Sequence, residues 1–98
     1  MPRAIVLDRR DNVATLIDPA GKGDTCTLQG ESEGRTTLLQ DVPFGHKVCV
    51  RDTSAGADIV KYGQVIGHAS VAIRAGEHVH VHNVESARGR GDRKEDRT

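Results

Sequence analysis

Residues 76–83 read Gly-Glu-His-Val-His-Val-His-Asn, so histidine alternates with valine immediately after a glycine. Successive side chains of an extended strand point to opposite faces, and the alternation therefore predicts a strand that begins at a turn. Three histidines would share one face of it: His78, His80 and His82. Val79, Val81 and Val84 would fill a core on the other face. The stretch predicts both a strand and a candidate site.

A related order of residues occurs three times: a glycine, two polar or small residues, then a β-branched residue. The copies begin at Gly45, Gly56 and Gly76. Each predicts a turn that starts a strand, and the uneven spacing argues against a solenoid repeat. Gly63 and Gly67 lie between the last two copies, where positive φ or close backbone approach is expected. We expect a compact, bent sheet whose strands restart after glycine turns.

The first half of the chain adds shorter signals. Aliphatic residues 3–7 and 13–18 flank polar residues 8–12, which predicts a hairpin. After a break rich in proline and glycine, a third strand is expected at residues 25–28. Residues 29–35 are polar and are expected to form a loop.

Composition predicts an all-β protein. The aliphatic residues are eleven Val, five Ile and five Leu, and eleven Gly and three Pro supply frequent turns. No long stretch has a helical period. Residues 1–85 are expected to form one domain, and residues 86–98, with almost nothing apolar, a disordered tail. A domain of this size buries only about 60–65% of its unfolded surface, which favours a partner chain or a homo-oligomer.

Charge and cysteine usage exclude several classes of protein. The formal net charge is +0, which gives no electrostatic case for nucleic acid or an acidic membrane. The first residues do not resemble a signal peptide and no apolar run is long enough for a membrane span, so neither is expected. Cys26 and Cys49 form no Cys-x-x-Cys pair, which argues against a zinc knuckle or a redox dithiol. We expect a cytoplasmic protein with reduced thiols.

The histidine stretch is the strongest chemical candidate. Neutral imidazole suits Zn, Fe, Ni or Mn. Alternate residues on a strand lie roughly 6–7 Å apart, however, so two of the three histidines plus a ligand from elsewhere are easier to bring to one ion. The alternative is a half-exposed strand whose polar face carries histidines.

Other candidates are less specific. Lys61 beside Tyr62 could bind a carboxylate and assist proton transfer, or could be a base whose stem covers apolar surface next to a packed ring. His46 and Lys47, after Gly45, are similarly ambiguous. No catalytic-triad, nucleophile-elbow or phosphate-loop motif supports acyl transfer or nucleotide chemistry.

Three blocks together resemble a known domain. Residues 45–48 read Gly-His-Lys-Val, residues 60–69 read Val-Lys-Tyr-Gly-x-x-Ile-Gly-x-Ala, and residues 76–83 form the histidine stretch. Over residues 4–85 the chain resembles the small N-terminal domain of the altronate and galactarate dehydratases. That domain belongs to the SAF group, which has a β-clip fold, and this implies an all-β SAF-type β-clip domain.

The resemblance implies a lyase. In such sugar-acid dehydratases a base removes the proton α to a carboxylate and a hydroxyl leaves the β carbon, with a divalent metal such as Fe²⁺ or Mn²⁺. The metal would be held by this chain or only in complex with a large catalytic subunit. In the related sulfolactate sulfo-lyases the leaving group is sulfite and the two parts are separate subunits. The chain resembles such a small subunit, inactive alone; the alternative is a non-catalytic binding or assembly module.

The candidate residues found above can be placed on that reaction as hypotheses, although the resemblance does not fix their exact roles. The candidate metal ligands are His78, His80 and His82, and the candidate catalytic residues are His78, His80, Lys61 and Tyr62. The candidate residues for binding a sugar-acid substrate are His46, Lys47, Lys61 and Asn83.

Overall fold

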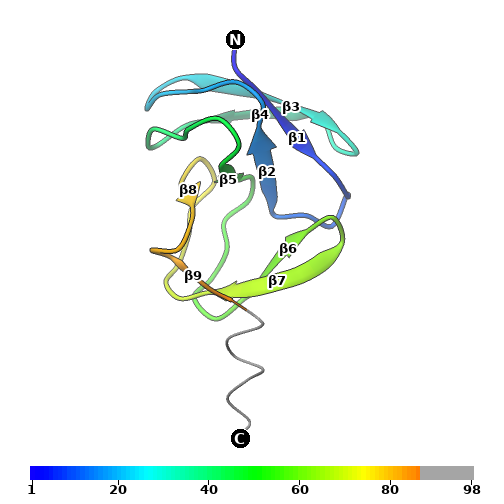
Figure 1. Cartoon of the computed structure of the whole chain (residues 1–98), viewed down its shortest axis with the longest axis vertical. Helices are drawn as coiled ribbons and strands as arrows, with labels where there is room; N and C mark the ends of the chain where they lie inside the picture. The colour runs from blue at the N-terminus through cyan, green and yellow to red at the C-terminus, as the bar shows by residue number, and fades with distance from the viewer. Residues whose placement is uncertain (87–98) are drawn as a thin grey trace, which may run out of the picture.

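The computed structural model describes residues 1–86, and every regular element in that range is a β-strand. A six-stranded sheet has the order β4-β3-β1-β2-β5-β8. Its strands are β1 (Arg3–Val6), β2 (Val13–Leu16), β3 (Thr25–Gly30), β4 (Gly34–Thr37), β5 (Lys47–Cys49) and β8 (His78–Val79). A smaller sheet, β6-β7-β9, comprises β6 (Asp58–Lys61), β7 (Gln64–Ala69) and β9 (Val84–Ser86). Figure 1 shows β1, β3 and β4 at one end of the molecule and the smaller sheet at the other. The prediction of an all-β, bent-sheet domain is confirmed.

Two clusters of buried residues form the core. The first consists of Ala4, Val6, Ala14, Leu16, Cys26, Leu28, Leu38, Val42 and Val48. The second consists of Val13, Cys49, Ile59, Ala69, Ile73 and Val79. Neighbouring residues of β2 and of β5 contribute to different clusters, because successive side chains of a strand point to opposite faces. These two strands therefore separate the two clusters.

Four turns share one pattern of backbone hydrogen bonds. Their glycines are Gly23, Gly45, Gly56 and Gly76, with φ of 92°, 82°, 86° and 96°. Each glycine N–H donates to the carbonyl of one buried residue, whose own N–H donates back to the carbonyl of the residue after the glycine. The buried residues held in this way are Leu38, Leu16, Ala69 and Cys49. A strand starts two residues after each glycine, as predicted for three of the four. We call this arrangement the glycine clamp.

The N-terminal half matches the prediction only in part. The expected hairpin is present as β1 and β2, which pair antiparallel. β3 pairs in parallel with β1 on its other side, which the sequence did not indicate. The loop expected at residues 29–35 is shorter than predicted: β3 continues to Gly30, β4 begins at Gly34 and pairs with β3, and residues 31–33 connect them. Polar, half-exposed β4 lacks the apolar alternation that identifies a strand.

The strand expected across residues 78–82 is also shorter than predicted. β8 ends at Val79, and residues 80–83 form a turn. Val79 is buried and Val84 packs against the second cluster, as expected, but Val81 is 82% exposed. The expected tail lies outside the described residues apart from Ser86, which ends β9. No helix in residues 1–86 is long and apolar enough to cross a membrane.

Two buried polar residues attach the smaller sheet to the larger. The Asn12 amide accepts a hydrogen bond from Val60 N (2.8 Å) and donates to Asp58 O (2.9 Å) and Thr53 Oγ1 (3.3 Å). The Asp11 carboxylate, 1% exposed, accepts from Tyr62 N (2.8 Å) and Gly63 N (2.9 Å). Backbone groups of the β6–β7 hairpin are therefore satisfied by side chains that precede β2.

The Asp11 contacts hold a strained hairpin turn. Tyr62 has a φ of 56°, and among residues 1–86 it is the one non-glycine residue with positive φ. With Gly63 at 73°, it forms a two-residue turn between β6 and β7, a type in which Asn-Gly is favoured. Gly67 lacks positive φ, but an added Cβ would clash with the Glu85 carbonyl. Positive φ at Gly63 and close approach at Gly67 confirm the two expectations for these glycines.

Removing the Asn12 amide tests the attachment between the sheets. Asn12→Ala leaves the Val60 N–H and the Asp58 carbonyl without that partner, and we expect the free energy of unfolding to fall by about 2–3 kcal/mol in urea titration. Gln29→Ala, at an exposed position of β3, should change it by less than about 0.5 kcal/mol. Equal losses in the two variants would contradict this role for Asn12.

Replacing Tyr62 tests the strained turn. Asn tolerates the left-handed conformation better than other residues with a Cβ, so Tyr62→Asn should raise the free energy of unfolding by about 0.5–1 kcal/mol. Tyr62→Ala keeps the unfavourable Cβ and serves as the matched control. If the Ala variant gains as much stability as the Asn variant, backbone strain at residue 62 is not the cause.

Candidate functional site

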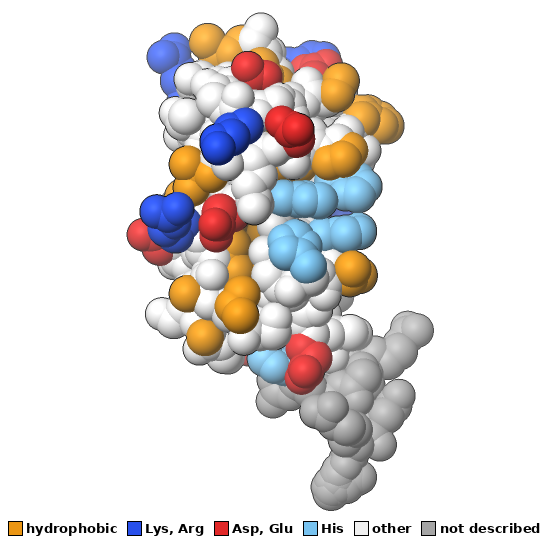
Figure 2. Space-filling model, turned by 90° about the vertical axis from the view of Figure 1, so that its left-hand side faces the viewer, with side chains coloured by type: hydrophobic (Ala, Val, Ile, Leu, Met, Phe, Trp, Pro, Cys, Tyr) orange, Lys and Arg blue, Asp and Glu red, His pale blue; other side chains and the backbone are white. Residues whose placement is uncertain are grey.

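The pairing of β5 with β8 brings three histidines together. The register pairs Lys47 with Val79 and Val48 with His78, so one step further along the ladder His46 faces His80. Candidate ligand nitrogens of His46, His78 and His80 all lie within 4.8 Å of one another. We call these residues the histidine triad. In Figure 2 histidine side chains gather at the middle of one face of the molecule.

The side-chain contacts within the triad are close. His46 Nδ1 lies 2.9 Å from His78 Nε2, and which nitrogen donates depends on the tautomers. The ring centroids of His46 and His80 are 4.7 Å apart, and those of His78 and His80 are 5.3 Å apart with nearly parallel planes. His46 and His78 are half-buried, whereas His80 is exposed. The three imidazoles form one continuous surface.

Hydrogen bonds fix the backbone at each triad residue. His46 N donates to Pro43 O, and His46 O accepts from Leu16 N, as part of the glycine clamp at Gly45. His78 N donates to Gln40 Oε1 at 2.9 Å. His80 N donates to Asn83 Oδ1 at 3.0 Å. Triad geometry therefore rests on ordered backbone rather than on a free loop.

Asn83 lies beneath the triad. Its side chain is 5% exposed, and its amide donates to His78 O at 2.8 Å while accepting from His80 N. The amide is occupied by the turn that follows β8. The structure thus places this candidate substrate-binding residue as a support for the histidines.

His82 lies beside the triad. Its ring centroid is 5.6 Å from that of His78, and its side chain is exposed. The structure brings His46, expected to bind substrate, into the compact group, whereas His82, expected to bind metal, flanks it. Sequence alternation could not reveal this, because His46 joins the group through pairing between strands distant in the chain.

The triad fits a divalent metal ion. Two nitrogens each about 2.1 Å from one ion at right angles are about 3.0 Å apart, close to the His46–His78 separation. Partial burial lowers the pKa of His78, and the charges of His46 and His80 lower it further. A lower pKa favours the neutral form, which is the form that binds metal. The donor set is three imidazoles, which suits Zn, Fe or Ni.

A pocket adjoins the triad. It has a volume of about 260 Å³, and Lys47 and His80 contribute polar groups to its wall. Burial lowers the pKa of Lys47, and repulsion from Lys61 lowers it further. Lys61 ends β6, and Tyr62, 69% exposed, lies at the tip of the same hairpin. Neither belongs to the triad.

Some residues of the site gave no signal in the sequence. Gln40, which holds His78, lies between β4 and β5 in the stretch Leu-Leu-Gln-Asp-Val, and nothing there marks it as part of a site. His68 Nε2 lies 3.1 Å from Glu85 Oε1 on the neighbouring strand, away from the triad. Cys49 is fully buried, and burial raises the pKa of its thiol.

Comparison with known proteins relates the domain to a family of dehydratase domains. The family described as the altronate/galactarate dehydratase SAF domain matches residues 2–87. The altronate dehydratase of Escherichia coli K12 is 40% identical over 76 residues, which cover 78% of this chain and 15% of that protein. The altronate dehydratase of Bacillus subtilis 168 is 36% identical over 88% of this chain and 17% of its own length. The chain spans less than a fifth of these two relatives.

A third relative is matched over nearly its whole length. The (2R)-sulfolactate sulfo-lyase subunit alpha of Chromohalobacter salexigens is 47% identical over 88 residues, which cover 86% of this chain and 94% of that subunit. This match runs along almost the whole of a small subunit. Together with the family match over residues 2–87, it shows that the chain belongs to the altronate/galactarate dehydratase SAF domain family.

Proposed function

We propose that this chain is the small subunit of a two-component lyase, in which a larger chain completes the active site. The reaction is elimination of water from a sugar acid of the altronate or galactarate type. Its relatives bear the names of such dehydratases and of a sulfo-lyase subunit, which supports the class of reaction. The cytoplasm is the expected compartment, and the unpaired cysteines Cys26 and Cys49 agree with a reducing environment.

The exposed position of the histidine triad carries this proposal. Three histidines converge on a surface, one of them exposed, and the metal-ligand group found among residues 1–86 includes no carboxylate. A base that removes a proton from carbon would have to approach from outside this group. A second protein surface over the triad would supply such a base and exclude water.

The triad would hold a divalent metal, Fe²⁺ or, with lower affinity, Mn²⁺. When bound, such an ion acts as a Lewis acid that polarises the substrate carboxylate or its leaving hydroxyl. His46 Nδ1 and His78 Nε2 are the ligand atoms that need the least movement, because they are already 2.9 Å apart. His82, beside the triad, would donate a proton to the departing hydroxyl.

The other candidate site residues would have more limited roles in the reaction. Lys61 and Tyr62 lie on the β6–β7 hairpin and would act only on a substrate that the larger chain brings to that hairpin. Asn83 is occupied by backbone and would orient His78 and His80 rather than contact the substrate.

Sulfite elimination is the second candidate. The sulfo-lyase subunit is covered over 94% of its length at 47% identity, whereas the dehydratases are covered over 15% and 17%. The chemistry differs only in the leaving group, so the same triad would serve. A non-catalytic binding or assembly module is the rival, and the second experiment below separates it from both lyases.

Metal titration of single-histidine variants tests the triad. With Mn²⁺ followed by calorimetry, on the chain alone and with its larger partner, His46→Ala should weaken binding at least about tenfold, about 1.4 kcal/mol. His82→Ala, which removes a neighbouring histidine outside the triad, should weaken it by less than about threefold. Equal losses of Mn²⁺ affinity in the His46→Ala and His82→Ala variants, or unchanged affinity in His46→Ala, would exclude the proposed ligand set.

Recovery of the partner tests the lyase. A tagged chain passed through extract of its native cell should retain a larger protein, and the pair should eliminate water from altronate or galactarate, or sulfite from sulfolactate. The chain alone should be inactive, because the metal-ligand group among residues 1–86 offers no carboxylate to act as the base. Recovery of a metal-free, inactive chain without a partner would favour the binding module, and full activity of the chain alone would refute the two-component scheme.

A further inference from the structure

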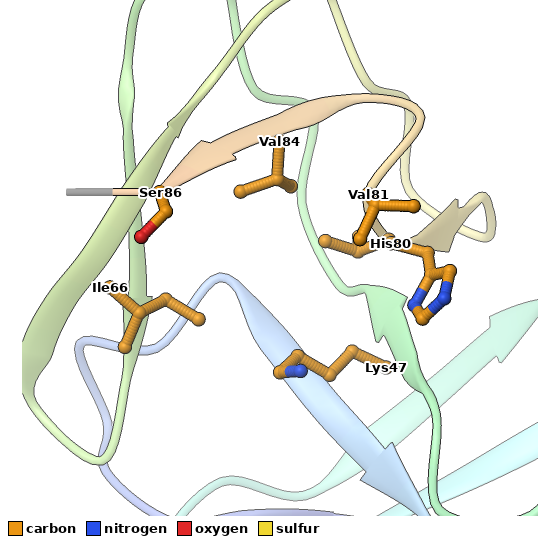
Figure 3. Close-up of a pocket in the computed structure, with 7 residues that line it drawn as sticks. Lys47, Ile66, His80, Val81, Val84 and Ser86 are labelled. Atoms are coloured by element: carbon orange, nitrogen blue, oxygen red, sulfur yellow. The ribbon is translucent and has the colours of Figure 1, made fainter. Parts of the chain in front are cut away.

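The pocket beside the triad has a distinct chemical character. β5, β7, β8 and β9, together with the turn after β8, surround a volume of about 260 Å³ (Figure 3). Most of its wall is aliphatic, from Ile66, Val79, Val81 and Val84. Lys47 provides a cation, and Ser86 lies at the end of β9. Among residues 1–86, no acidic side chain contributes to the wall.

Lys47 brings a positive charge into this wall. Figure 3 shows its side chain among the residues that line the pocket, extending toward Ile66. The residue is half-buried, and no carboxylate of residues 1–86 lies within ion-pair distance of its amine. An ammonium that is partly removed from water and lacks a counter-charge favours binding of an anion.

The surroundings select the kind of anion. Aliphatic walls offer no partners for additional charges or for a series of hydroxyls, so one end of the ligand must be compact and singly charged. A carboxylate matches one ammonium. The volume suits a short acid or one end of a longer acid, because pockets for drug-sized ligands begin at about 300 Å³.

His80 connects this pocket to the triad. The same side chain lines the pocket and belongs to the group of ligand nitrogens within 4.8 Å of one another. An acid whose carboxylate meets Lys47 would therefore have its next carbons near His80, the member of the triad that lines the pocket. We propose that the pocket is a carboxylate subsite, with Lys47 as the residue that anchors one carboxylate of a small hydroxy acid. The assignment of that acid as the substrate rests on the proposed lyase function.

Binding of a simple acid to the full chain tests the subsite without the larger partner. Glycerate is the probe, and glycerol, which has the same number of carbons and no charge, is its control. In ¹H–¹⁵N spectra, glycerate should shift the amide signals of Lys47, Ile66 and Val84 saturably, and glycerol should not. Lys47→Met preserves length and apolar contact, and should weaken glycerate binding at least about tenfold. Lys22→Met, at an exposed lysine in the turn before β3, should leave it unchanged.

The outcomes separate this inference from the lyase. Saturable glycerate binding that depends on Lys47 supports the subsite even if no larger partner is recovered. Glycerate that shifts no pocket signal, or binds Lys47→Met as well as the original chain, overturns the subsite even if the two-component enzyme is active. If glycerate does not bind through Lys47, the Lys47 amine would instead be available to a carboxylate of the larger subunit. Protection of Lys47 from acetylation in the assembled pair, but not in the chain alone, would identify that arrangement. The spectrum of each variant reports whether the variant is folded.

Discussion

Two backbone hydrogen bonds hold β8 in place, and the geometry of the histidine triad depends on them. Gly76 N donates to Cys49 O, and Cys49 N donates to Glu77 O, both bonds at 2.8–2.9 Å. Gly76 has positive φ, and an added Cβ would clash with the Thr37 carbonyl, so only glycine fits there. This clamp sets the register in which His78 opposes Val48. The equivalent clamp at Gly45 fixes the backbone of His46.

Buried polar groups add a second constraint. Val60 N, Tyr62 N and Gly63 N all donate to the side chains of Asn12 and Asp11. The smaller sheet is therefore held to β2 by hydrogen bonds as well as by the second apolar cluster. Because β7 and β9 of that sheet form one side of the pocket, the position of this sheet also determines the space next to Lys47. Stability and the site depend on the same contacts.

Local sequence predicted the turns well and the pairing of strands poorly. Glycines at 45, 56 and 76 could be recognised because positive φ is a local property. The fourth clamp was missed because Gly23 is followed by Asp-Thr-Cys, with no β-branched residue at the expected place. The alternation of histidine and valine also predicted too long a strand at β8. The pattern does not reveal that the Asn83 side chain accepts a hydrogen bond from His80 N and closes a turn. His46 enters the triad only through long-range pairing.

The account makes the triad, rather than the alternating stretch alone, the centre of the site. Its most direct test is anomalous diffraction from crystals of the chain, assembled with its larger partner and loaded with Mn²⁺. The account predicts a peak about 2.0–2.3 Å from His46 Nδ1, from His78 Nε2 and from one ring nitrogen of His80, with His82 outside bonding distance. A peak bound by His82 without His46, or held entirely by the larger chain, would contradict it.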